Sequence, residues 1–264
     1  MEVPHTDQSV LPPRLRFSDV SVRFGGLTAL DSVSFTVPAG AVVGVIGPNG
    51  AGKTTLFNVI CGFNTPASGS LELDGEPFRP RRHRLTRNGV ARTLQGLGLF
   101  PGLTVLENVM LGLEGSASHN ALQDALALPG SRRGENRLRK RGLQALDELG
   151  IVSFAAALPD TLPYGIRKKV ALARALSGSP RLLLLDEPAG GLSHEDIDEL
   201  AGIISSVPAA GCSVVLVEHH VDLVMNVCER IAVLDFGKLI AEGTPAEISA
   251  NQAVTDAYLG VEPA

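Results

Sequence analysis

The run Gly47–Thr55 combines three glycines with a lysine and two threonines, residue types that together can hold an anion. It reads G-P-N-G-A-G-K-T-T, which fits the pattern G-x-x-x-x-G-K-[ST]. In such a loop the backbone turns tightly around phosphate oxygens and points successive N–H groups at them, and the following helix adds the positive end of its dipole. The alternative, an ordinary glycine turn, leaves the Lys-Thr pair unexplained. The run therefore predicts a site for a nucleoside triphosphate, formed by Gly47, Asn49, Gly50, Ala51, Gly52, Lys53, Thr54 and Thr55.

Two adjacent carboxylates, Asp186 and Glu187, follow four consecutive leucines. Beside a phosphate-binding loop, in which Lys53 would reach the β- and γ-phosphates and Thr54 would bind Mg²⁺, Asp186 takes the position of an aspartate that also holds the metal. Glu187 points differently, because neighbours on a strand alternate sides, and could polarise or position a water for attack on the γ-phosphate. Helix-capping carboxylates after a buried strand are the alternative, which the loop makes less favourable.

Two further polar residues could complete this chemistry. His219 follows another apolar run and could contact both the γ-phosphate and Glu187. Gln95 lies between the first half of the chain and a helical segment, and its amide oxygen could bind Mg²⁺ or hold the attacking water. By composition alone, a structural histidine and an exposed glutamine explain these two residues better than functional roles do.

Buried strands must position these groups. The apolar runs 41–46, 182–185 and 213–217 show no alternation, which favours parallel strands covered on both faces. The loop, the carboxylate pair and the histidine follow these runs directly, at the strand ends where open parallel sheets bind ligands. A helix is expected after the carboxylates, at Ser193–Ser206, with acidic residues in its first turn.

Other segments alternate with period two, which predicts antiparallel strands at Leu15–Phe17, Val20–Phe24 and Val33–Val37, with hairpins at 69–75 and 231–241. Residues 104–175 are typical of helices, with a capping box at Thr104–Glu107 and helices at Arg137–Leu149 and Ile166–Leu176. We therefore expect an α/β fold, in which a mainly parallel sheet carries an antiparallel β subdomain and an inserted α-helical subdomain. Its boundaries are a flexible tail at 1–13 and one domain at 14–264, divided into a core at 14–97 and 178–264 and a helical insertion at 98–177.

The composition limits the partners and the compartment. A net charge of −5 over 264 residues gives no basic field that would suggest nucleic acid. Three scattered cysteines without C-x-x-C spacing fit buried thiols in a reducing compartment. The start of the chain has no apolar core of a signal peptide, and no apolar run approaches the roughly 18–20 residues that span a bilayer. The basic segments 79–87 and 132–141 fit solvated faces, a membrane surface or a partner's acidic groups.

Taken together, the motifs resemble the ATP-binding subunits of ABC transporters over almost the whole chain, from about Leu15 to Gly260. The resemblance identifies Gln95 with the Q-loop, Asp186-Glu187 with the end of the Walker B strand, and His219 with the switch histidine. It implies an ATPase whose P-loop (RecA-like) core binds ATP and Mg²⁺, with Thr54, Gln95 and Asp186 on the metal. It also implies catalytic roles for Lys53, Glu187 and His219, and an adenine-stacking role for Phe24.

The family's signature Leu-Ser-Gly-Gly-Gln aligns with Leu162–Ile166, where Pro163, Tyr164 and Ile166 depart from it. Gly165 is retained, and the resemblance implies that it meets the γ-phosphate bound to the opposite subunit of a head-to-tail dimer. Several local runs, among them A-R-T before Gln95 and A-Y-L-G near the end of the chain, look like those of the branched-chain amino acid importer subgroup.

That subgroup implies two ATPase subunits, identical or paralogous, beneath two integral membrane permease subunits fed by an extracytoplasmic solute-binding protein. The chain would then lie peripherally at the cytoplasmic face of the inner membrane, with no nucleic acid partner. An exporter or lipid-transport ATPase uses the same residues and stays open as an alternative. A soluble ABC protein is a second alternative, although such proteins commonly carry two cassettes or a coiled-coil insertion. A nucleotide-binding regulator without turnover fits the complete catalytic set poorly.

Overall fold

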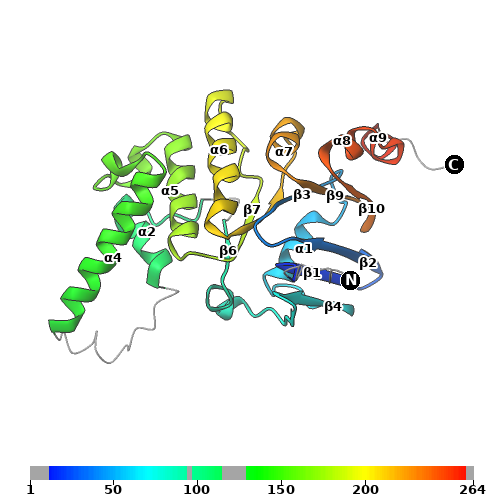
Figure 1. Cartoon of the computed structure of the whole chain (residues 1–264), viewed down its shortest axis with the longest axis horizontal. Coiled ribbons are helices and arrows are strands. Elements are labelled where there is room, and N and C mark those ends of the chain that lie inside the picture. The colour runs from blue at the N-terminus through cyan, green and yellow to red at the C-terminus, as the bar shows by residue number, and fades with distance from the viewer. Residues whose placement is uncertain (1–11, 94–96, 115–128, 260–264) are drawn as a thin grey trace, which may run out of the picture.

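A six-stranded sheet runs through the middle of the structure, a computed structural model that describes residues 12–93, 97–114 and 129–259 (Figure 1). The strand order is β10-β9-β3-β8-β7-β6, with every pair parallel except β10 on β9. The strands are β3 (Val42–Ile46), β6 (Val90–Arg92), β7 (Leu182–Asp186), β8 (Ser213–Val217), β9 (Arg230–Asp235) and β10 (Lys238–Gly243). All residues of β3, β7 and β8 are buried, as their uninterrupted apolar runs predict.

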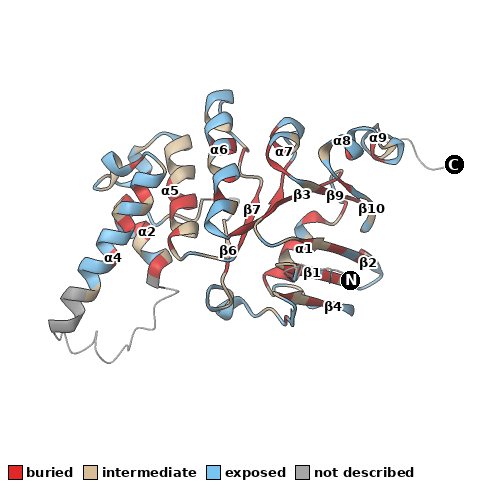
Figure 2. Cartoon of the chain, in the orientation of Figure 1, coloured by how far each residue is buried: buried red, intermediate tan, exposed pale blue. Residues whose placement is uncertain are grey.

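A second, antiparallel sheet has the order β2-β1-β4-β5. Its strands are β1 (Leu15–Phe24), β2 (Leu27–Val37), β4 (Ser68–Leu73) and β5 (Glu76–Pro77). The two strands expected at 15–17 and 20–24 form one continuous strand. Asp19 between them has a positive φ of 50°, and a register shift between Phe17 and Val20 lets β1 continue its pairing with β2. Helix α1 (Lys53–Ile60) lies between the two sheets, and its Leu56, Phe57 and Ile60 share one core with both (Figures 1 and 2).

The opposite face of the large sheet is covered by helices α6, α7, α8 and α9 (Figure 1). Their bounds are α6 (His194–Ser206), α7 (Val221–Val227), α8 (Pro245–Ser249) and α9 (Gln252–Leu259). Helix α6 has acidic residues in its first turn as expected, and Ser193 caps it, since its hydroxyl accepts a hydrogen bond from the Asp196 N–H. The sequence did not predict α7, which is short and follows directly on the histidines.

Helices α2 (Val105–Glu114), α4 (Pro129–Glu148) and α5 (Tyr164–Ser177) pack around a core of their own (Figure 2). The predicted capping box opens α2, where the Thr104 N–H donates to Glu107 Oε2 at 2.7 Å. Two helices begin earlier than expected: α4 starts at Pro129 rather than Arg137, and α5 at Tyr164 rather than Ile166. Proline favours the start of a helix, and Pro129 and Pro163 stand at these two starts.

Short 3₁₀ helices connect the larger elements. They are η1 (Arg82–Arg84), η2 (Thr86–Asn88), η3 (Val152–Phe154), η4 (Pro159–Thr161) and η5 (Val207–Ala210). The expected metal ligand Gln95 lies outside the described residues, and so does all of the expected tail at 1–13 except its last two residues. Within the part of the chain that the structure describes, no helix has the length and apolar character to cross a membrane.

The topology decides which motifs meet. Strands β3, β8 and β7 are consecutive neighbours and all run in the same direction. The loop after β3, the Glu218-His219 pair after β8 and the carboxylates at the end of β7 therefore emerge at one edge of the sheet, as predicted.

Candidate active site

The loop after β3 has the backbone geometry of a tight anion-binding turn. Gly47 and Gly52 adopt φ of 151° and 104°, in the region that side chains other than glycine avoid. A Cβ on Gly47 would lie 2.1 Å from the carbonyl oxygen of Leu234, so only glycine fits there. Asn49 and Gly50 are exposed at the rim, and Ala51 is buried beneath it. Helix α1 begins directly after Gly52, which is its N-cap residue.

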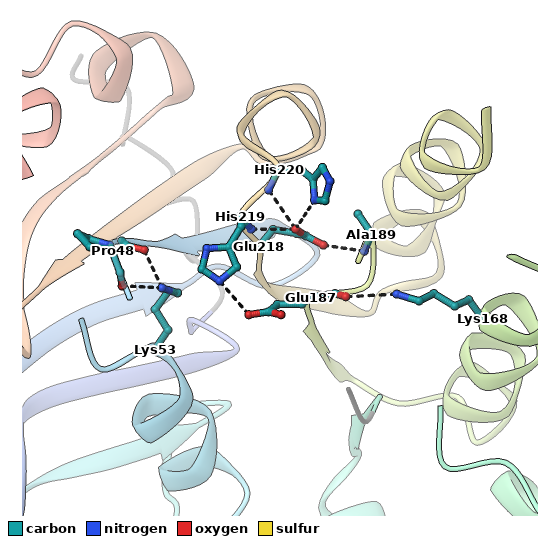
Figure 3. A network of polar contacts seen from close by, with 9 residues as sticks. Pro48, Lys53, Lys168, Glu187, Ala189, Glu218, His219 and His220 are labelled. Carbon is teal, nitrogen blue, oxygen red and sulfur yellow. Dashed lines mark hydrogen bonds and ion pairs between the residues drawn. The ribbon is translucent and has the colours of Figure 1, made fainter. Parts of the chain in front are cut away.

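Lys53 holds its ammonium group against this loop. Its Nζ donates hydrogen bonds to the carbonyl oxygens of Gly47 at 2.6 Å and Pro48 at 2.9 Å, and the residue is only 6% exposed. Burial lowers the pKa of Lys53, while the nearby charge of Glu187 acts to raise it. A cation is thus fixed at the mouth of the loop and faces the Glu187 carboxylate, whose position Figure 3 shows.

Glu187 and His219 lie together beside this cation. His219 Nε2 and Glu187 Oε1 are 2.9 Å apart, and both side chains are partly exposed, at 43% and 37% (Figure 3). Glu187 has φ of 49°, a left-handed conformation that is unusual for a residue with a side chain. Its N–H donates to the carbonyl of Val217 at 2.8 Å, which ties it to the adjacent strand β8. The carboxylate is accessible, hydrogen-bonded and held in a strained conformation, which are features of a functional position.

Asp186 is the second carboxylate of the site and is almost fully buried. Its Oδ2 accepts a hydrogen bond from Arg92 Nη2 at 2.8 Å, so the two side chains form a buried ion pair. Arg92 also donates to Asn58 Oδ1 on α1 at 3.3 Å, and its guanidinium lies over the rings of Phe57 and Phe63. Arg92 stands in the A-R-T run before Gln95, but the sequence did not predict its contact with Asp186. Its partner is distant in sequence, and only the pairing of β6 with β7 places it opposite Leu184.

The oxygens of Asp186 and Thr54 suit a hard divalent cation. Carboxylate and hydroxyl oxygens are the ligands that Mg²⁺ prefers, and it commonly takes only one or two protein ligands beside phosphate oxygens. Among the described residues no cluster of three or more His, Cys, Asp or Glu could hold a metal alone. Thr54 is exposed on the first turn of α1, directly after the buried Lys53, and Thr55 beside it is partly buried. The residues present therefore fit a metal that is held together with a phosphate group.

Glu218 is a buried carboxylate whose hydrogen bonds the sequence did not predict. It is 2% exposed and accepts hydrogen bonds from the backbone N–H groups of Ala189 (2.6 Å), His219 (2.8 Å) and His220 (3.1 Å). His220 Nδ1 is a fourth partner at 3.2 Å. The signal for its role was its place at the end of a fully apolar strand, where a charged side chain must find partners.

Two predicted residues lie apart from this cluster. Phe24 ends β1 and is 50% exposed, so its ring is free to stack on a flat group. Gly165 lies in the first turn of α5, where a Cβ would come within 2.6 Å of Asp196 Oδ1. Neither residue is joined to Lys53 or Glu187 by a hydrogen bond or ion pair among the described residues.

Sequence comparison matches residues 30–190 to the model of the family described as ABC transporter. Residues 238–264 match a second model, described as branched-chain amino acid ATP-binding cassette transporter. The chain is 38% identical, over 94% of its length and 98% of the relative's, to a high-affinity branched-chain amino acid transport ATP-binding protein of Pseudomonas aeruginosa. It is 34% identical over the same shares to a protein of that name in Escherichia coli. A lipopolysaccharide export system ATP-binding protein of Haemophilus influenzae is also 34% identical, over 88% of the chain and 90% of that protein.

Solved structures of ATP-binding cassettes also resemble this chain. The ADP conformation of an ATP-binding cassette from an ABC transporter superposes with a TM-score of 0.80 at 28% identity, over 94% of this chain and 99% of that one. A dimeric post-hydrolysis state of another such cassette, bound to ADP and Pi, superposes with a TM-score of 0.73 at 26% identity, over 88% and 98%. Both superpositions extend over most of this chain, which confirms the expected fold class.

Proposed function

The chain belongs to the ABC transporter family of ATP-binding proteins, and from this premise we propose that it is the ATP-hydrolysing subunit of a membrane importer for branched-chain or other amino acids. The observation that carries the hydrolytic role is the Glu187–His219 pair beside the buried Lys53 ammonium at the mouth of the loop. The match of the C-terminal segment 238–264 to a branched-chain amino acid transporter model supports the class of cargo.

We assign the chemistry as follows. The loop N–H groups and Lys53 bind the triphosphate and neutralise its charge, which is the main catalytic means in phosphoryl transfer. Glu187 orients a water toward the γ-phosphate, and His219 links this carboxylate to the phosphate. Thr54, Asp186 and Gln95 would hold Mg²⁺, which would supply positive charge to the phosphate oxygens. Phe24 stacks on the base.

Gly165 completes the site of a second copy of the chain or of a paralogous subunit. Helix α5 begins at Tyr164, so the N–H groups around Gly165 belong to a helix N-terminus that can meet an anion. The dimeric relative bound to ADP and Pi supports a dimeric arrangement. The departures at Pro163 and Tyr164 leave the contact to backbone amides, because no serine hydroxyl is present.

The membrane partner is an integral permease, fed by an extracytoplasmic binding protein, so the chain would lie at the cytoplasmic face of the membrane. A groove of about 410 Å³ between η1, η2, α2 and α5 offers a surface for a permease segment. Its walls include the exposed aromatic rings of Phe63 and Phe100, exposed Leu111, and the guanidiniums of Arg82 and Arg174. Mixed apolar and cationic walls suit a short amphipathic helix of a partner.

We also propose the predicted division of the chain, with a core at 14–97 and 178–264 and a helical part at 98–177. The separate core of α2, α4 and α5 supports it. Arg174 of the helical part contacts the boundary, since its guanidinium donates to the carbonyl of Leu97, the last residue of the first core segment, at 3.0 Å, and to that of Gly98, the first residue of the helical part, at 2.6 Å.

Export is the alternative, and it is less favoured, because the lipopolysaccharide export protein matches at lower identity and over a smaller share of both chains than the Pseudomonas aeruginosa importer protein. Co-purification separates the two. An amino acid importer predicts that the tagged chain brings down permease subunits whose vesicles take up amino acids when ATP is present on the chain's side. Vesicles that instead release a lipid would favour export.

The test of the hydrolytic role is Glu187→Gln. This variant should bind ATP as the wild type does but turn over at least about a hundredfold more slowly, because the amide cannot act as a base. It should also accumulate as a closed dimer with ATP, measured by light scattering after size exclusion. Glu76→Gln, an exposed glutamate on β5, is the matched control and should keep the wild-type rate. Unimpaired hydrolysis by Glu187→Gln would remove Glu187 from the role.

A further inference from the structure

The turn that follows Glu187 is held from two sides by charged side chains of other elements. Glu187 itself carries the left-handed φ of 49°, so this turn has a conformation that its own residues do not favour. Such backbone persists only where neighbouring groups fix it. The groups that do so are Glu218 at the end of β8 and Lys168 on α5 (Figure 3).

Glu218 holds the turn through the backbone N–H of Ala189. Its Oε1 accepts from Ala189 N–H at 2.6 Å, while Oε2 accepts from the N–H groups of His219 and His220. One buried carboxylate thus joins the segment after Glu187 to the segment that carries His219. Since Glu187 and His219 contact each other at 2.9 Å, the same carboxylate fixes the backbone on both sides of that contact.

Lys168 holds the turn through its carbonyls. Its Nζ donates to the carbonyl oxygens of Glu187, at 3.3 Å, and of Pro188. Burial lowers the pKa of Lys168, and the charges of Glu218 and Glu187 act to raise it. The ammonium therefore lies close enough to both carboxylates to interact with their charges while it binds the backbone between them.

We propose that Glu218 and Lys168 are positioning residues for Glu187, and that Lys168 makes the position of Glu187 depend on α5. This proposal rests on the proposed function, in which Glu187 acts on the attacking water. Lys168 lies one turn of helix after Gly165, so any displacement of the start of α5 moves the group that holds Glu187. The helix that would meet the nucleotide of the opposite subunit is thereby bonded to the Glu187 turn of its own subunit.

The neighbouring lysine shows that the contact is specific to one position of α5. Lys169 turns away from the site and pairs with the exposed Glu199 on α6. It is thus a matched control for Lys168. It has the same side chain on the same helix, but it contacts one carboxylate oxygen of Glu199 and does not contact the turn.

The experiment compares ATP affinity with the turnover rate in four variants. Glu218→Gln keeps the shape of the side chain but turns an amide N–H₂ toward N–H donors, and Lys168→Met removes the ammonium. Both should bind ATP with affinity within about twofold of the wild type and lose about 10- to 100-fold in kcat, because a misplacement of about 1 Å has this effect on a reacting group. Lys168→Arg, which can still donate to two carbonyls, should restore most of the rate, and Lys169→Met should leave it unchanged.

Combination with Glu187→Gln tests whether the two residues act through Glu187. If they do, Glu187→Gln/Glu218→Gln and Glu187→Gln/Lys168→Met should turn over at the same residual rate as Glu187→Gln alone. A further multiplicative loss would overturn the proposal, and so would a wild-type kcat in Glu218→Gln and Lys168→Met. Parallel loss of ATP binding and turnover, without rescue by Lys168→Arg, would assign both residues to the support of the fold and would also overturn it.

The hydrolytic role of Glu187 and the positioning role of Glu218 and Lys168 can be refuted separately. If Glu187→Gln keeps its full rate, the proposed function of Glu187 is wrong whatever the other variants do. If Glu187→Gln stalls while Glu218→Gln and Lys168→Met are unimpaired, the hydrolytic role stands and only the positioning role is refuted.

Discussion

Replacement of Arg92 by methionine should destabilise the protein more than any other single change to the arginines near the site. Arg92 is the ion-pair partner of Asp186, and their side chains are only 16% and 3% exposed. Methionine keeps much of the apolar stem that packs near Phe57 and Phe63 but leaves the Asp186 carboxylate without its cation. The expected loss therefore comes mainly from an uncompensated buried charge.

The magnitude follows from this burial. Removal of one partner from a buried pair costs about 3–5 kcal/mol, and loss of the cation–π contacts adds about 0.5–1 kcal/mol. Because Arg92 is partly accessible to water, we expect the lower end, about 3 kcal/mol for Arg92→Met. Asp186→Asn should cost less, about 1–2 kcal/mol, since an amide oxygen can still accept from the guanidinium. The double variant should cost less than the sum of the two by at least about 1 kcal/mol.

Urea unfolding without nucleotide measures these differences. The chain has no tryptophan, so the transition is best followed by far-UV circular dichroism. A cost of about 3 kcal/mol also corresponds to a fall of about 6–12 °C in Tm for a chain of this size. Arg82→Met is the matched control, because Arg82 is exposed and lies over the Phe63 ring at 5.2 Å without an ion pair among the described residues. Strict additivity of Arg92→Met and Asp186→Asn would refute the ion pair as the source of the loss.

Two further predictions concern burial and close packing. Burial raises the pKa of the Cys228 thiol to about 12 from its ordinary 9.0, so above pH 9 the unfolded chain binds fewer protons than the folded one. The free energy of unfolding should therefore fall as pH rises from about 9 to 12, and Cys228→Val should flatten this slope in urea titrations at several pH values; an unchanged slope would contradict it. Gly112→Ala should destabilise by more than about 1–3 kcal/mol, because a Cβ on α2 would lie 2.0 Å from the Arg174 carbonyl on α5. Gly102→Ala, where a Cβ meets nothing within 4 Å, is its control and should leave Tm unchanged.

The parts of the fold that carry strong periodic or apolar patterns could be predicted from the sequence. Strand β8 coincides with the predicted run 213–217, and the first turn of α6 follows its Ser193 cap. Strand β6 could not be predicted, because three residues are too few to show a period and their strand character comes from pairing with β7. Helix α7 is similarly short, and packing on the sheet rather than its own propensity stabilises it.

The site divides in the same way. The contact of Glu187 with His219 was expected, because both residues follow buried strands that must be parallel and close. The contacts of Arg92, Lys168 and Glu218 could not be predicted, because their partners lie 94, 19 and 29 residues away along the chain, at separations that no local pattern reports. A charged side chain just after a buried strand is the signal that could have found Glu218, since burial requires a partner for it. Arg92 gave no such signal, because it lies in the short strand β6.

The order of the central strands sets a fixed spacing for the chemistry. Strand β8 separates β3 from β7, and neighbouring strands lie about 4.8 Å apart, so the phosphate loop and Glu187 start about 10 Å apart with the histidine segment between them. The backbone hydrogen bonds between the strands fix this distance. Insertions in the connections beyond these loops leave the distance between the phosphate loop and Glu187 unchanged. One residue added within β7 or β8, in contrast, would turn the groups that follow to the other face of the sheet. Variation among related chains should therefore gather in the connections and leave the three strand lengths constant.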